Sequence, residues 1–226
     1  MKLKHDDPEY IAATRLMILG EWDNAEIAFQ KLAKTYDESA FIQMALGNIA
    51  YGRGHLDDAV DFYDQAIQRK SDFGNAYYKK GVCLYRMGFL QQALATFEEI
   101  LKLEGQSHAM ADYFIGLINN FLGKDAKAME AFADLRSCSP QSKIANYYMA
   151  QLLYKQHRFG EAAELLGELL EATPAFAEVQ FQMGKTLLAM HKNFEAIKHY
   201  KKALELNPDD NRSKSALELL TDVQWP

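Results

Sequence analysis

The feature that most constrains this chain is a repeat of about 34 residues that keeps its phase almost from end to end. An alanine marks each copy, and the interval between successive marker alanines is constant, apart from one extra residue before the fourth. They are Ala25, Ala59, Ala93, Ala128, Ala162 and Ala196. Such a chain is expected to fold as a row of similar units, each packed against its neighbours, instead of around one central core.

Two further positions keep the same phase. A large apolar side chain follows each marker alanine by one helical turn: Phe29, Tyr63, Phe97, Phe132, Leu166 and Tyr200. A small residue precedes each marker at a fixed distance: Ala13, Gly47, Gly81, Gly116, Ala150 and Gly184. The chain is rich in alanine and leucine and has only four valines, a balance that favours helices over strands.

These residues resemble the tetratricopeptide repeat (TPR) family, whose repeat is about 34 residues long. The best matching stretches are Leu46-Gly47-Asn48 leading to Gly54, the run from Tyr77 to Phe97, and the ending Ala203 to Pro208. The register predicts six units at 6–39, 40–73, 74–107, 109–142, 143–176 and 177–210, with His108 inserted. The resemblance implies an all-α, right-handed α-solenoid (superhelix) of six TPR helix pairs.

Small residues let the two helices of a pair approach closely, so we expect Gly81 to meet the region of Ala93, with Phe97 filling the gap toward the next unit. The turn between paired helices is assigned to glycines, and prolines end three second helices. These are Gly20, Gly54, Gly88 and Gly123, and then Pro140, Pro174 and Pro208. Residues 211–226, with Ala216, Leu217, Leu220 and Val223 at helical spacing, are predicted to form a C-terminal capping helix.

Some positions depart from the family pattern. The large residue usual near the start of a unit is present as Tyr77, but the other units have polar residues there: Glu9, Gln43, Asp112, Asn146 and Gln180. Lys80 and Asn119 occupy further positions that are normally apolar.

Net charge and composition restrict the classes of ligand that we expect the chain to bind. The net charge is −6 with a pI near 5.5, and no basic run exceeds two residues, so nucleic acid is not expected as a ligand. No apolar run is long enough to span a membrane, and the start of the sequence, basic but without an apolar run behind it, is not expected to be a secretory signal. Cys83 and Cys138 lack metal-ligand spacing and suggest a reducing compartment, which predicts a cytoplasmic location.

In this family the ligand-contacting side chains lie in a stripe on the first helix of each pair. By resemblance, the peptide-binding groove is predicted to contain Phe41, Met44, Asn48, Tyr51, Tyr78, Val82, Tyr85, Arg86, Tyr113, Leu117, Asn120, Tyr147, Gln151, Tyr154 and Lys155. This stripe is strongly aromatic, and tyrosine suits peptide recognition because it offers a large contact area and a hydroxyl group. The alternative is that these rings simply pack between neighbouring first helices.

The cations of the stripe, Arg86 and Lys155 together with Lys185, hint at an acidic ligand, although solvated charges explain them as well. The two-carboxylate clamp of chaperone-binding members is absent. Its positions are occupied in one window by Met44, Asn48, Lys79, Met110 and Phe114. Binding of an acidic chaperone C-terminus by that route is therefore not expected.

No catalytic residue, metal site or cofactor is predicted. His55, His157 and His191 fall in or beside turns, and each histidine, including His199, is expected to be a solvated surface residue. Cys83 is expected to be a small core residue.

The sequence therefore favours a non-catalytic adaptor that holds a partner protein or peptide in a Tyr-rich groove. The alternative is a self-assembling scaffold, a homo-oligomer joined through repeat ends or the groove, with Tyr10, Ile11 and Met17 of the first unit uncovered.

Overall fold

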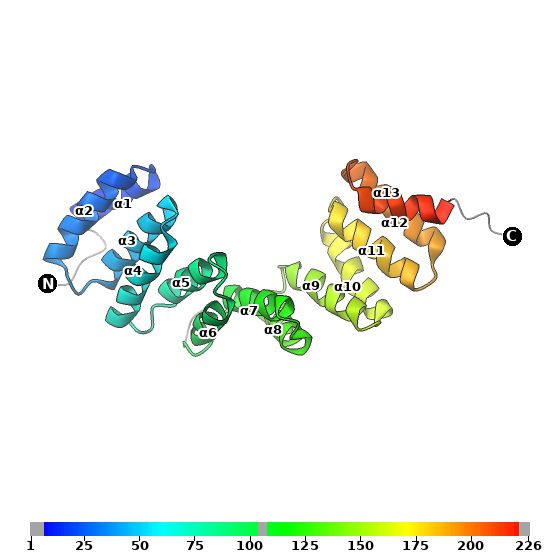
Figure 1. Ribbon diagram of the computed structural model, residues 1–226, viewed down its shortest axis with the longest axis horizontal. Helices are drawn as coiled ribbons and strands as arrows, with labels where there is room; N and C mark the ends of the chain where they lie inside the picture. Colours follow the sequence, from blue (N-terminus) through cyan, green and yellow to red (C-terminus); the bar gives the residue numbers. More distant parts are fainter. Residues whose placement is uncertain (1–6, 104–107, 222–226) are drawn as a thin grey trace. The chain divides into compact units, whose positions relative to one another are not determined.

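The computed structural model describes residues 7–103 and 108–221, and within these ranges every regular element is an α-helix (Figure 1). The helices are α1 (Pro8–Ile18), α2 (Trp22–Thr35), α3 (Ala40–Arg53), α4 (Leu56–Arg69), α5 (Gly74–Arg86), α6 (Leu90–Ile100), α7 (Ala109–Phe121), α8 (Asp125–Cys138), α9 (Ile144–Lys155), α10 (Phe159–Ala172), α11 (Ala177–Ala189), α12 (Asn193–Leu206) and α13 (Asn211–Thr221). The predicted all-α fold is confirmed.

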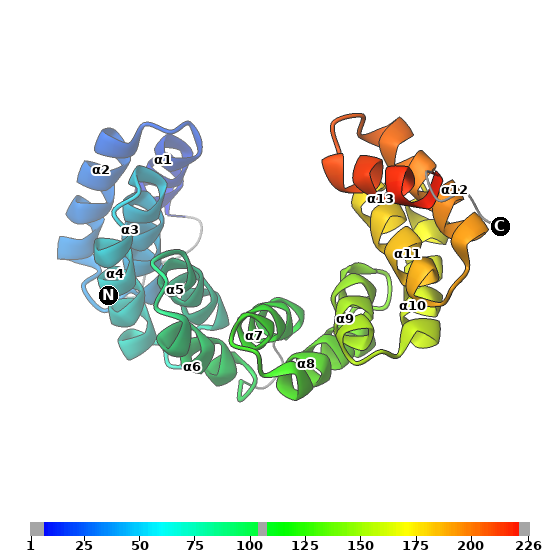
Figure 2. The same cartoon turned by 45° about the vertical axis from the view of Figure 1, so that its right-hand side comes forward.

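Consecutive helices pack as antiparallel pairs, and neighbouring pairs pack on each other within each compact unit, α2 on α3 and α4 on α5 in the first, α8 on α9 and α10 on α11 in the second. The pairs α1/α2, α3/α4, α5/α6, α9/α10 and α11/α12 are visible in both views (Figures 1 and 2). The chain divides into two compact units between Ile118 and Asn119, inside α7. The boundaries of the six sequence repeats stay a prediction.

Glycines of first helices lie directly against aromatic rings of second helices. A Cβ atom on Gly47 would lie 2.6 Å from the ring of Tyr63, and one on Gly184 would lie 2.9 Å from the ring of Tyr200. A Cβ atom on Gly81 would meet Phe97 first, at 2.7 Å, one helical turn beyond the predicted Ala93. The phase-keeping small and large residues are therefore the two sides of one contact.

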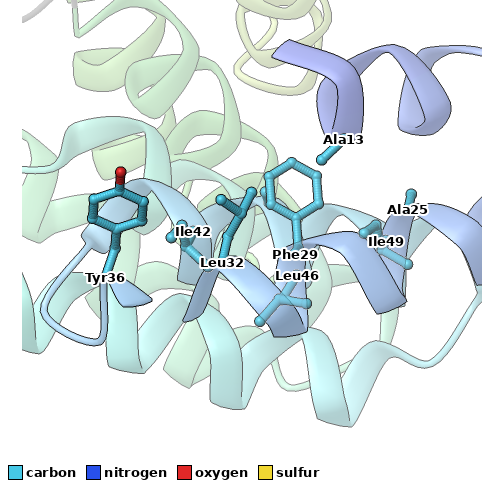
Figure 3. Close-up of a cluster of buried hydrophobic side chains, with 9 residues drawn as sticks. Ala13, Ala25, Phe29, Leu32, Tyr36, Ile42, Leu46 and Ile49 are labelled. Atoms are coloured by element: carbon cyan, nitrogen blue, oxygen red, sulfur yellow. The ribbon is translucent and has the colours of Figure 1, made fainter. Parts of the chain in front are cut away.

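The same large residues also join one pair to the next, as predicted for Phe97. The ring of Phe97 stacks on Phe114 of α7 with centroids 4.8 Å apart, and Phe132 stacks on Tyr148 of α9 at 4.9 Å. In the first unit, Phe29 is fully buried and its ring faces Ala13 (Figure 3). Phe97 thus stabilises both its own helix pair and the junction to α7.

The turns inside the pairs need a left-handed residue. The predicted glycines all adopt this left-handed backbone conformation, with φ of 76° at Gly20, 83° at Gly54, 82° at Gly88 and 70° at Gly123. In the last two pairs the position is taken by His157 (φ 59°) and His191 (φ 60°). Because a side chain at positive φ is strained, these two turns are conformationally less favourable than the first four.

The polar residues that depart from the family pattern are mostly buried. Gln43, Asp112, Asn146 and Gln180 are each less than 9% exposed. Asn146 donates to Glu168 of α10 at 2.9 Å, and the side-chain oxygen of Gln180 lies 2.7 Å from Nδ1 of His199 in α12. Each of these two contacts joins a first helix to a second helix by a polar bond where the family has an apolar contact.

His199 is therefore not the solvated surface residue that the sequence suggested. Its ring is half-buried against α11, and burial lowers the pKa of its imidazole below the ordinary value of 6.5. Cys83, by contrast, is fully buried as predicted, and burial raises the pKa of its thiol to about 11.

The two outermost helices differ from the others at key register positions. Arg15 of α1 is exposed, whereas the equivalent residues of the later first helices are buried: Ile49, Cys83, Ile118, Leu152 and Thr186. Glu218 of α13 stands one repeat length after Gly184, where close helix packing requires a small residue. α13 packs on α12 as the predicted capping helix, while Val223 lies outside the described residues.

Candidate functional site

The predicted stripe lies on the first helices, and none of its members is fully buried. Arg86 and Lys155 are exposed, and the other predicted residues are half-buried. None is sealed in a core, and none of the aromatic members stands fully in solvent. The stripe is thus a surface on which one side of each ring packs and the other remains available for contact.

The stripe falls into two parts because the chain divides inside α7. The first unit contains the members on α3 and α5 and the first part of α7, through Leu117. The second unit contains Asn120 and the members on α9.

In the first unit two cations cover one tyrosine ring. Nζ of Lys79 lies 5.5 Å and Cζ of Arg86 lies 4.9 Å from the ring centroid of Tyr51. Both cations come from α5 and the tyrosine from α3, so the contact joins neighbouring first helices. Attraction between a cation and the negative face of the ring favours this position of Arg86 over Tyr51.

An aromatic cluster continues this surface toward α7. Tyr78 and Tyr85 both approach Phe114 edge to face, with centroids 6.0 and 5.4 Å apart, and Tyr113 lies 5.4 Å from the same ring. Burial raises the pKa of Tyr78 above its usual value. The alternative interpretation, in which the rings pack between first helices, is correct for Tyr78 and Tyr85, but both remain half-exposed.

Two predicted stripe residues mainly support packing. Phe41 lies edge to face with Phe73, 5.2 Å away, and Met44 contacts the buried residues around Tyr63 and Phe73. These side chains contribute more to the junction between α3 and α5 than to an open surface.

The side-chain oxygens of two predicted amide residues, Asn48 and Asn120, already accept hydrogen bonds from other residues of the chain. The side-chain oxygen of Asn48 accepts a hydrogen bond from the Tyr63 hydroxyl at 3.1 Å. The oxygen of Asn120 accepts one from Lys155 at 2.9 Å. Each amide therefore has its NH₂ group left to donate to a ligand carbonyl or carboxylate.

In the second unit the stripe is tied to the capping helix. The Tyr147 hydroxyl donates to Glu178 of α11 at 3.3 Å, and Arg212 of α13 donates to the same carboxylate at 2.6 Å. Burial and the nearby Glu178 raise the pKa of Tyr147 to about 12. Burial opposes ionisation of Glu178, but hydrogen bonds from Arg212 and Gln182 outweigh it and lower the pKa of this carboxyl.

The remaining stripe residues of the second unit also contact neighbours. Nζ of Lys185 in α11 lies 4.3 Å above the ring of Tyr154, which repeats the cation-on-tyrosine contact of the first unit. Lys155 lies 3.5 Å from Asp125 besides donating to Asn120. A carboxylate of the chain itself therefore neutralises the exposed cation of this part.

Sequence reasoning did not select Lys79, Phe114 or Tyr148, although all three occupy one register position, two residues before the small residue. Their contacts with Tyr51, Phe97 and Phe132 show that this position faces the preceding pair. The periodic pattern contained this signal, because the position falls on the same helical face in every repeat.

The described residues offer no metal centre, since no three of their His, Cys, Asp and Glu side chains gather at ligand distance. None of the helices in the described ranges is both long enough and apolar enough to cross a bilayer.

Comparison with known proteins shows which family has this architecture. Tetratricopeptide repeat family models match residues 12–75, 78–143 and 177–210, which is more than half of the chain. The protein belongs to the tetratricopeptide repeat family.

Individual relatives are more distant. The chain is 27% identical over 166 residues to a barley (Hordeum vulgare) protein named "Probable UDP-N-acetylglucosamine--peptide N-acetylglucosaminyltransferase SPINDLY", covering 69% of this chain and 17% of that protein. The chain spans between 17% and 43% of the length of the first three curated relatives that it matches.

Two solved structures share the fold. One is YrrB, described as a TPR protein with an unusual peptide-binding site, with a TM-score of 0.74, 21% identity, and coverage of 84% of this chain and 98% of YrrB. The other is PilF of Pseudomonas aeruginosa, with a TM-score of 0.78, 16% identity, and coverage of 94% and 96%. At these identities the likeness concerns the fold alone.

Proposed function

We propose that this protein is a non-catalytic adaptor that binds a peptide or helix of a partner protein along its first helices. The observation that carries this proposal is the half-buried stripe of aromatic and apolar side chains on successive first helices. Half-exposed tyrosines that are already fixed by neighbours lose little conformational freedom on binding, so they suit a recognition surface.

The comparisons support the proposal at the level of class. TPR proteins typically mediate protein–protein interactions, and one solved neighbour is described as having a peptide-binding site. The transferase names among the curated relatives describe whole proteins of which this chain matches only a part. They therefore give no reason to propose catalysis here.

Affinity capture from source-cell lysate tests the proposal with a double variant in the stripe. Tyr85→Ala with Tyr154→Ala removes one half-exposed ring from each unit. The control is Ile27→Ala with Phe194→Ala, which removes side chains that are 66% and 84% exposed on the second helices α2 and α12. Circular dichroism verifies that both variants stay folded.

We expect partners captured by the wild type to be lost with the tyrosine variant and kept with the control. Retention of every partner by the tyrosine variant, or loss of the same partners with the control, would contradict binding along the first helices. In either case the interaction would have to be assigned to another surface.

The second candidate, self-assembly through the first helix pair, is favoured by one observation. Ile11 and Ile18 of α1 are 53% and 77% exposed, one above the other, two helical turns apart. Tyr10 and Met17, which the sequence suggested as uncovered, instead pack partly against the first core cluster. Light scattering that detects only monomers over the accessible concentration range would rule this candidate out.

A further inference from the structure

The helices of the middle pairs divide by charge. The first helices α3 and α5 contain no aspartate or glutamate, whereas α4 carries four aspartates and α6 carries two glutamates. The chain as a whole has a net charge of −6. The face made by α3 and α5 is therefore free of acidic side chains in a protein that is acidic overall.

Two cations on this face have no carboxylate of their own. No carboxylate among residues 7–103 and 108–221 lies within ion-pair distance of Lys79 or Arg86, and their contacts are with the Tyr51 ring. Lys80, the next residue, contrasts with them, because its Nζ lies 2.6 Å from Asp64 of α4. The acidic second helix thus neutralises one lysine of α5 and leaves its neighbour uncompensated.

The way Arg86 rests on Tyr51 leaves its hydrogen bonds available. The attraction between a guanidinium and an aromatic ring is electrostatic and needs no hydrogen-bond acceptor, so the five N–H donors are not satisfied by the ring. No described residue accepts a hydrogen bond from Arg86 or from the NH₂ group of Asn48. A carboxylate that approaches the edge of Arg86 can therefore form two parallel hydrogen bonds with it.

In the second unit Lys185 also lies over a tyrosine without an ion pair among the described residues, but its helix α11 carries the acidic Glu178, and two other cations are compensated within the chain. Lys155 lies 3.5 Å from Asp125, and Arg212 pairs with Glu178 and Asp210. Free donors, uncompensated positive charge and half-exposed tyrosines come together on α3 and α5.

We propose that Asn48, Tyr51, Lys79 and Arg86, here called the α3–α5 patch, bind an acidic segment of the partner protein. Carboxylates of that segment pair with Arg86 and Lys79, and the Asn48 amide donates to an oxygen of the ligand. Apolar side chains of the segment lie against the adjacent Tyr85. This inference rests on the proposed function, since it names the chemistry of the partner that the first helices hold.

Selection from a displayed library of random dodecapeptides tests the charge preference directly, using the full chain as bait. The variant Lys79→Glu with Arg86→Glu reverses the charge of the patch. The control Lys198→Glu with Lys201→Glu makes the same change of net charge on two exposed lysines of the second helix α12. Selected peptides are then synthesised, and their affinities are measured at low and high salt.

We expect peptides selected by the wild type and by the control to be enriched in Asp and Glu. Charge reversal in the α3–α5 patch should lower the affinity for these peptides by about tenfold, and high salt should lower the affinity of the wild type as well. Acidic enrichment that persists unchanged with the reversed patch, or an absence of charge bias in the wild type, overturns the acidic preference.

The same experiment separates this inference from the adaptor function. Unbiased peptides whose binding is lost in Tyr85→Ala/Tyr154→Ala would leave the adaptor standing and remove only the acidic preference. If no peptide is enriched, the proposal that the patch binds an acidic segment is overturned. The lysate capture alone then decides whether the first helices bind a partner.

Discussion

Gly81 lies against the ring of Phe97 so closely that a Cβ atom would come within 2.7 Å of it. Phe97 cannot move away easily, because it is fully buried and its ring stacks on Phe114 with centroids 4.8 Å apart. The absence of one methyl group thus allows the close packing of α5 and α6 and, through Phe97, the junction to α7.

Gly81→Ala should destabilise the protein by about 1–2 kcal/mol, because the overlap with Phe97 exceeds the gain in helix propensity. The control is Gly167→Ala on α10, where a Cβ atom meets nothing within 4 Å. That substitution should stabilise by up to about 1 kcal/mol from helix propensity alone. Urea unfolding of the two variants measures both effects, and equal shifts would show that the contact does not limit packing.

His191→Gly should stabilise the protein by about 0.5–1 kcal/mol, because glycine removes the strain of a side chain at φ 60°. Gly54→Ala should have the opposite effect, since it introduces this strain at φ 83°, where nothing lies within 4 Å of the added carbon. His55→Gly is a matched control, because His55 has φ −80° and gains only flexibility from glycine. Thermal unfolding compares the three, and a lower midpoint for His191→Gly would contradict the assigned strain.

Arg212→Ala should loosen the capping helix. Arg212 pairs with Glu178 and lies over the ring of Phe181, and these contacts connect α13 to α11. Removal leaves a half-buried carboxylate without its cation, which should cost about 1 kcal/mol or more. Hydrogen exchange in α13 should rise, whereas Lys214→Ala, on an exposed residue of the same helix, should leave it unchanged. Unaltered exchange in both would mean that apolar packing alone holds the cap.

Acid should destabilise the protein through His199. Its pKa is lowered in the folded state by burial, so below about pH 6.5 the unfolded chain takes up the proton more readily. Stability contributed by the neutral ring is present above that pH and is lost as pH falls through the two pKa values. Unfolding midpoints measured from about pH 7.5 to 5 should fall less steeply for His199→Gln than for the wild type. Equal slopes would mean that His199 titrates normally.

Much of the fold was predictable because its cause is periodic. The small residue at Gly81 and the large residue at Phe97 recur in every repeat, and the turn glycines recur in the first four. Since the pattern repeats, one physical explanation covers many residues. The capping helix could be predicted for a similar reason, because the periodic apolar positions continue after residue 210.

The contacts of the stripe could be predicted only in part. Register placed Tyr51 and Arg86 in the stripe on successive first helices, but did not show that the guanidinium would lie over the ring. It identified Asn48 as a ligand-binding amide, but not that the Tyr63 hydroxyl already uses its oxygen. Such details depend on side-chain rotamers and on distances between helices, which no periodicity contains.

The sequence by itself determined the repeat, the helical fold and the face that carries the tyrosines, because these follow from residue size and spacing along one helix. The tertiary structure decided which groups remain available on that face. Lys80 is paired and Lys79 is not, because only one of them reaches Asp64 of the neighbouring helix. Ion pairing and hydrogen bonding depend on atoms brought together from different helices, so the chemistry of the surface appears only after the helices have packed.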